Sequence, residues 1–218
     1  MTDAVRPALR VLMPRGHEAA RRFIVDLVLG EWLGQDLEVA VGDTPEVVIT
    51  RPHLADGRRI IMPDVLFGTS DDAWLTSGSL PSAPFADLAL GTILGIPGQD
   101  RIAAVYADPT ADGHAARAEE GALRLLVDVL GSVFYLVTRY EELVGGERDR
   151  HDRFLAASSA TARQGLLQRP IVDEYLDLLW AALHAQWADL IRPLAAFRLR
   201  PTHDVDQPWA VLDKHPGA

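Results

Sequence analysis

Two carboxylates and an imidazole follow closely on one another near the end of the chain. The run Thr202-His203-Asp204-Val205-Asp206 comes after residues 197–200, which we expect to form a strand. On a regular strand the carboxylates of Asp204 and Asp206 would face the same side. Oxygen and nitrogen donors at that density suit a divalent metal, or one carboxylate could take a proton from metal-bound water. An aspartate-rich turn or a helix cap explains the same residues without any site, and spacing alone favours that interpretation.

A second polar group is spread over the segments 138–142, 149–154 and 158–159. Within it Arg139 and Glu142 are three positions apart on an expected helix, so they can form a weak pair. The group could form a polar pocket in which an arginine clamps a carboxylate or a sugar. It could also be a hydrogen-bonded brace that holds the charged loop to the helix ends. We favour the brace, because ion-pair networks between elements are usually structural.

The elements that must position these residues alternate between strands and helices in the first half of the chain. Apolar periodicity predicts a helix over 17–33 and a long loop over 64–98. Strands are expected at 9–13, 37–41, 46–50, 59–62 and 102–106. This alternation favours an α/β fold with a small mixed or parallel sheet and flanking helices.

The second half of the chain is expected to hold long helices. An apolar stripe predicts one long helix over 119–144, stopped by Gly145-Gly146. Pro170 is well placed to open the next helix, and Pro193 to end it. Trp180 and Trp187 lie on the apolar face of that helix and are expected in the core.

Composition excludes several classes of function. The 218 residues include no cysteine, so disulfides, zinc–cysteine sites, iron–sulfur clusters and thiol nucleophiles are excluded. With 31 acidic residues against 21 lysines and arginines, the net charge is -10, and we expect neither nucleic acid nor a membrane surface as a partner. The first ten residues lack the apolar core of a secretory signal, and we expect a cytoplasmic protein.

The motif at 202–206 resembles the first motif of the polysaccharide deacetylases, carbohydrate esterase family 4 with its NodB homology domain. That motif is typically Thr-Phe-Asp-Asp, with variants of the Asp-x-Asp type. The preceding residues resemble a domain often found just before such a catalytic domain. The resemblance rests on Arg139 to Glu142, Asp149 to Phe154, Ser158-Ser159 and Pro170 to Asp173, and it is good over about residues 120–206.

The resemblance implies a metal-dependent hydrolase that removes acetyl groups from a carbohydrate. It implies that Asp204 is the general base that activates water and that Asp206 is a metal ligand. His203 replaces an apolar residue of the commoner motif and is given no catalytic role. The implied domains are an accessory α/β domain at 1–195 and, at 196–218, the start of a deacetylase barrel with its first strand.

One departure from the family pattern changes the expected activity. The metal site of the family needs two histidines about one helical turn apart, well downstream of the first motif, and only His215 follows it here. Tight sites usually provide three or four protein ligands, so two carboxylates hold a divalent ion weakly. We therefore expect zinc or a similar metal only in a full-length protein, none bound tightly to this chain, and no catalysis by this chain alone.

The expected partners are a downstream deacetylase barrel in the same polypeptide and carbohydrate, on which Trp74, Tyr106 or Trp209 could stack. A different interpretation is a free-standing α/β binding or scaffold domain without enzymatic activity. A third is a nucleotide-binding domain, with a phosphate at the turn after Met13. That turn lacks both the three-glycine fingerprint and the phosphate-loop lysine.

Overall fold

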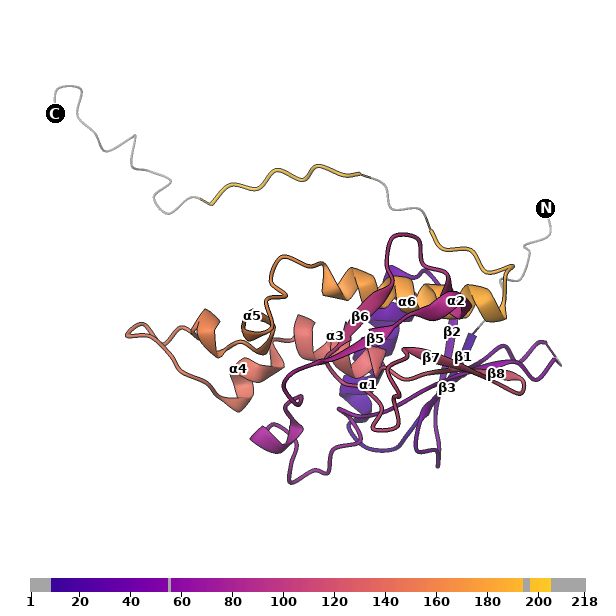
Figure 1. The fold of residues 1–218 in the computed structure, drawn as a ribbon, viewed down its shortest axis with the longest axis horizontal. Helices are drawn as coiled ribbons and strands as arrows, with labels where there is room; N and C mark the ends of the chain where they lie inside the picture. The colour runs from indigo at the N-terminus through magenta and orange to yellow at the C-terminus, as the bar shows by residue number, and fades with distance from the viewer. Residues whose placement is uncertain (1–8, 55, 194–196, 205–218) are drawn as a thin grey trace.

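A mixed six-stranded sheet forms the centre of the protein (Figure 1). The computed structural model describes residues 9–54, 56–193 and 197–204. The strand order is β2-β1-β3-β4-β8-β7, in which β1 runs parallel to β2 and β4 parallel to β8, and the other pairs are antiparallel. The strands are β1 (Leu9–Met13), β2 (Leu37–Val41), β3 (Val47–Thr50), β4 (Arg59–Met62), β7 (Ala116–Glu119) and β8 (Ala122–Leu125). The expected α/β fold with a mixed sheet and flanking helices is confirmed.

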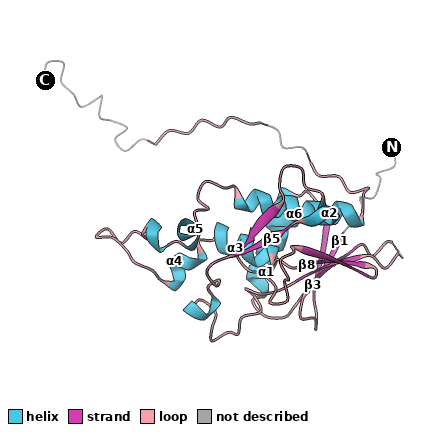
Figure 2. Ribbon diagram, viewed as in Figure 1, coloured by secondary structure: helices cyan, strands magenta, loops and turns pink. Residues whose placement is uncertain are grey.

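The helices cover one face of this sheet (Figure 2). In β1, Leu9, Val11 and Met13 are buried, whereas Arg10 is exposed and pairs with Glu38 of β2 on the other face. The period-2 alternation of a half-buried strand produces this pattern. Helix α6 (Ile171–Gln186) packs on β4 and β8, and α3 (Val129–Val137) contacts α6 and α1 (Glu18–Val25). The core lies between these helices and the sheet.

The expected helix at 17–33 is present, but its second part is wider than an α-helix. Helix α1 continues directly into the π-helical segment η1 (Asp26–Trp32). At its end the amide of Leu33 donates to the carbonyl of Val28, five residues back. Apolar periodicity alone does not separate an α-helix from this widened form.

The prediction of one long helix over 119–144 is wrong. Strands β7 and β8 form a hairpin in which Glu119 pairs with Ala122. Gly121 lies in the turn with a φ of 65°, a left-handed conformation that glycine adopts at little cost. The apolar residues of β8 therefore face the core as a strand, and the helical part begins only at Val129. It is broken again at Arg139, whose φ is 55°, before α4 (Tyr140–Val144).

The segment expected to be one long loop contains regular structure. It holds the short 3-10 helix η2 (Ser77–Ser79), strand β5 (Ala86–Ala89) and helix α2 (Gly91–Leu94). Strand β5 pairs with β6 (Arg101–Ala104) in a separate two-stranded sheet. Prolines and small polar residues dominate residues 77–84, and because this composition is typical of a loop, the strand that follows was not predicted.

The C-terminal half has shorter helices than expected. Helix α4 ends before Gly145-Gly146 as predicted, and α6 begins immediately after Pro170, although it ends at Gln186 and not near Pro193. Between α4 and α6 lie the 3-10 helix η3 (Ala156–Ser158) and helix α5 (Ala160–Arg163).

The segment 197–204 carries neither a helix nor a strand, so the strand expected at 197–200 is wrong. It is drawn in yellow in Figure 1, and all eight of its residues are exposed. A strand needs a partner for its amide and carbonyl groups, and these residues form none in the described part of the chain. No helix within the described residues is both long and apolar enough to cross a membrane.

Candidate functional site

The residues singled out near the end of the chain are described only in part. Asp204 and His203 lie on the exposed segment, without regular secondary structure. Asp206 lies outside the described residues, as do Trp209 and His215. Across residues 9–54, 56–193 and 197–204, no three histidines or carboxylates lie together as a metal would require. The assignment of Asp204 as a base and Asp206 as a ligand therefore stays a prediction.

The second polar group does converge in space, and Glu141 is at its centre. The Oε2 atom of Glu141 accepts hydrogen bonds from the Tyr135 hydroxyl at 2.8 Å and the Ala160 amide at 2.8 Å. Its Oε1 atom accepts one from the Ser159 hydroxyl at 2.7 Å. These bonds join α3, α4 and the start of α5. Glu141 therefore braces these three helices to one another, whereas the brace expected from the sequence was one that holds the charged loop to the helix ends.

The charged loop at 149–154 is closed by a local set of bonds. Asp149 Oδ1 accepts from the amides of His151 at 2.8 Å and Arg153 at 3.0 Å, and Oδ2 accepts from the Arg153 guanidinium. The guanidinium hydrogen bond is the main reason why the pKa of Asp149 is lowered. The loop is thus held by its own residues, and His151 and Arg153 are exposed.

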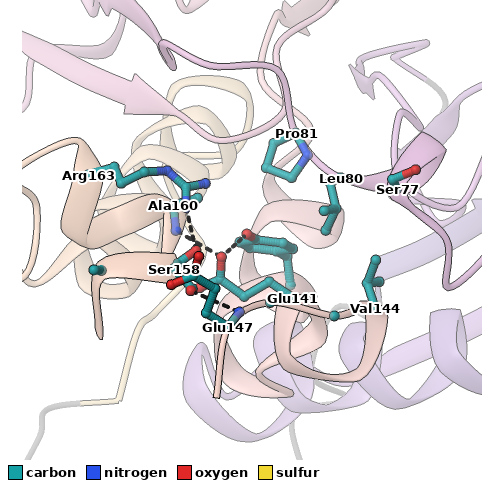
Figure 3. A pocket seen from close by; sticks show the side chains of 13 residues that line it. Ser77, Leu80, Pro81, Glu141, Val144, Glu147, Ser158, Ala160 and Arg163 are labelled. Atoms are coloured by element: carbon teal, nitrogen blue, oxygen red, sulfur yellow. Dashed lines mark hydrogen bonds between the residues drawn. The ribbon is translucent and has the colours of Figure 1, made fainter. Parts of the chain in front are cut away.

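A pocket of about 540 Å³ opens beside the Glu141 brace (Figure 3). Its volume lies within the roughly 300–1,000 Å³ typical of small-molecule sites. Figure 3 shows Glu147, Ser158 and Arg163 on one side of the pocket, with Leu80 and Pro81 across from them. Four parts of the chain therefore form it: η2 with the loop after it, α3 through Tyr135, α4 with the residues that follow it, and η3 with α5.

The arginine at this pocket is not one that the sequence pointed to. Arg139 pairs with Glu142 on the surface, and Arg153 with Asp149. Arg163 lines the pocket, where its guanidinium donates to the carbonyl of Ser158. The sequence offered no signal for it, because only the turn between η3 and α5 brings it opposite Leu80.

The charges of Arg163 and Glu147 are not neutralised by the protein. Neither side chain takes part in any ion pair formed among the described residues, and both are exposed. Glu147 donates its backbone amide to the Ser158 hydroxyl at 3.1 Å, which fixes the main chain at this rim. The pocket thus presents one guanidinium and one carboxylate that are free to contact a ligand.

A buried charged group elsewhere in the core was missed by sequence reasoning. The Arg21 guanidinium forms a bidentate pair with Asp64, and both side chains are 3% exposed. Arg21 also donates to the carbonyls of Gly16 at 2.6 Å and Phe67 at 2.8 Å. Arg21 lies on an apolar helix face, one turn before Val25, and this position was the sequence feature that could have indicated its burial.

Asp128 lies near this pair and caps helix α3. Its Oδ1 atom accepts from the Gly131 amide at 2.7 Å, and its Oδ2 atom accepts from the amides of Val65 and Leu66. Burial raises the pKa of Asp128 to about 7, against the opposing effect of these three amides, and the nearby Asp64 raises it further. An aspartate just before an apolar helix is typical of a helix cap. The helix expected over 119–144 placed Asp128 in its interior, so the cap was not predicted.

The aromatic residues considered for sugar stacking are mostly packed inside the protein. Tyr106 is 5% exposed, and its hydroxyl donates to the carbonyl of Ser79. Trp74 stacks on His17 with ring centroids 4.0 Å apart and contacts Phe67. Trp187 is buried as expected, whereas Trp180 is only partly buried. His17, which lies in the turn where a phosphate was considered, thus has its ring stacked on Trp74.

Comparison with protein-family models identifies a family for this chain. The model of a family of unknown function, DUF7033, matches residues 9–188, which include the whole sheet and the pocket. No curated protein and no solved structure matches the chain. Because the matched segment covers most of the 218 residues, the chain belongs to the family of unknown function DUF7033.

Proposed function

We propose that this chain is the N-terminal portion of a metal-dependent polysaccharide deacetylase-like protein, with a non-catalytic accessory domain at 1–195. One observation carries the non-catalytic part of this proposal. The buried or braced carboxylates of the α/β body are each engaged by protein donors: Asp64 by Arg21, Asp128 by three amides, and Glu141 by two hydroxyls and an amide. A carboxylate held in this way braces the structure and is poorly available as a base or a metal ligand.

The chemistry is assigned to the region that follows the accessory domain. The motif at 202–206 supports this assignment, with Asp204 as the base and Asp206 as a metal ligand. The described residues do not supply a complete ligand set for zinc or a similar metal. The remaining ligands are proposed to come from a downstream barrel, and we derive no catalytic step for this chain.

The first test is to read the DNA in frame beyond the codon for Ala218. The proposal expects a barrel with two histidines about one helical turn apart. A stop codon at this point, or an unrelated domain, would overturn it in favour of a free-standing binding or scaffold domain.

The second test is an assay of acetate release. The purified 218-residue chain is incubated with chitooligosaccharides or acetylated xylan and added zinc or cobalt. We expect no release from this chain, and release from the longer protein that is lost in its Asp204→Asn variant. Metal-dependent release by the chain alone would contradict the accessory role.

A further inference from the structure

The pocket beside the Glu141 brace has two unlike walls. Glu147, Ser158 and Arg163 provide polar groups on one side, and Leu80, Pro81 and Val144 provide an apolar surface on the other (Figure 3). A ligand that fits both walls must carry hydrogen-bonding groups along one edge and apolar carbon surface along another.

The polar wall offers both a donor and an acceptor. Arg163 presents a planar set of N–H donors, and Glu147 presents carboxylate oxygens that accept. Most other arginines of the protein are in ion pairs, including Arg139, Arg148, Arg153 and Arg169 of the same half. Arg163 and Glu147 thus place charges of both signs at one concave surface, and neither is in an ion pair among the described residues.

The charge balance of the pocket disfavours a simple anion. Two carboxylates, Glu141 and Glu147, face one guanidinium in the lining, and the whole chain carries a net charge of -10. An anion drawn to Arg163 would be repelled by both acids. A neutral ligand with hydroxyl groups avoids this repulsion, since each hydroxyl can donate to a carboxylate and accept from a guanidinium.

The pocket is also fixed before any ligand arrives. The Glu141 bonds hold α3, α4 and α5 together, and Ser158 links the rim to Glu147 through its hydroxyl and to Arg163 through its carbonyl. Preorganised groups lower the entropic cost of binding.

We propose that this pocket binds a neutral saccharide, with Arg163 and Glu147 hydrogen-bonding its hydroxyl groups and Leu80 and Pro81 covering the C–H surface of a sugar ring. The proposal goes beyond the accessory role. An accessory domain can pack on a barrel without binding sugar, and a free-standing module could bind sugar without a barrel.

The test measures binding of short oligomers of N-acetylglucosamine, xylose and glucose to the full chain, by saturation-transfer NMR and calorimetry. The variants Arg163→Ala and Glu147→Gln each remove one polar partner and are expected to weaken binding about tenfold or more. Ala157→Trp places a large ring in the pocket lining without removing a charge, and it should abolish binding. Thermal unfolding of each variant shows that the fold is retained.

Matched control substitutions lie outside the pocket. Arg150 and Glu120 are exposed and take part in no ion pair among the described residues, so Arg150→Ala and Glu120→Gln should leave binding unchanged. The panel also contains free amino acids and inorganic phosphate. The proposal is overturned if no saccharide binds, if binding survives all three pocket variants, or if only an amino acid or phosphate binds. None of these outcomes depends on acetate release or on the downstream sequence.

Discussion

The protein has two groups of acidic and arginine side chains, and the two groups differ in burial and in hydrogen-bond partners. In the core, Arg21, Asp64 and Asp128 are buried, and each is bonded to groups of the protein. At the pocket rim, Arg163 and Glu147 are exposed and have no ion-pair partner among the described residues. A buried charge needs a partner within the protein to offset the cost of desolvation, whereas an exposed charge is solvated by water and stays accessible to a ligand. Burial and bonding partners therefore distinguish the structural charged residues from the candidate functional ones, because both groups contain the same residue types.

The largest expected effect is loss of the buried pair. Arg21→Met leaves the Asp64 carboxylate buried without its cation and should lower the free energy of unfolding by about 3–5 kcal/mol, measured by urea denaturation. Arg22→Met is the matched control. Arg22 pairs with Asp26 on the surface of the same helix, so its loss should cost about 0.5 kcal/mol or less. Equal effects of the two substitutions would contradict the contrast between the two groups.

The second prediction concerns pH. Because the pKa of Asp128 is about 7 in the folded protein against 3.8 in the unfolded chain, the folded state binds more protons between these values. The stability from this group is fully present below the unfolded pKa and is lost as pH rises through about 7.

The stability of the wild type relative to Asp128→Asn should therefore fall between about pH 4 and about pH 7, by on the order of a few kcal/mol, and level off above that range. Denaturation at several pH values measures this difference. The Asp36→Asn variant changes an exposed side chain that forms no ion pair among the described residues, and it should keep the wild-type profile. A pH-independent difference would show that Asp128 does not titrate in this range.

A smaller effect is expected at the brace beside the pocket. Glu141→Ala leaves the buried Ala160 amide and the Tyr135 and Ser159 hydroxyls without their acceptor, and it should cost about 1–3 kcal/mol in thermal or urea unfolding. The neighbouring Glu142 pairs only with exposed Arg139, so Glu142→Ala should cost about 0.5 kcal/mol or less. If the two costs were alike, Glu141 would not be a brace.

The smallest effect is expected in the exposed segment. Asp204→Asn should change the free energy of unfolding of the chain by less than about 0.5 kcal/mol, because the side chain is exposed and makes no contact that folding requires. The rim variants Arg163→Ala and Glu147→Gln should be similarly mild in stability and differ from Asp204→Asn only in ligand binding. A large loss of stability at Asp204 would place it in the folded body, against its proposed role.

Local patterns predicted the elements where one periodicity dominated. Strands β1 and β2 follow apolar alternation, β4 follows a short apolar run before Pro63, and α6 follows an apolar stripe that starts after Pro170. The prediction of one helix over 119–144 failed because the apolar residues of β8 and α3 fit a single helical stripe in spite of Arg124 and Asp128 between them. The turn at Gly121 and the cap at Asp128 divide this run into a hairpin and a helix.

By itself, the sequence determined an acidic, cysteine-free α/β protein, and it placed Glu141 and Ser159 in one functional or bracing group. Only the tertiary structure decided which arginines form ion pairs and that Arg163 lines the pocket beside Glu141. A salt bridge such as Arg21–Asp64 joins residues 43 positions apart, and the pocket joins the loop after η2 to α5. Spacing along the chain reports on neighbours within one helix or strand, whereas burial and charge pairing depend on how distant elements pack.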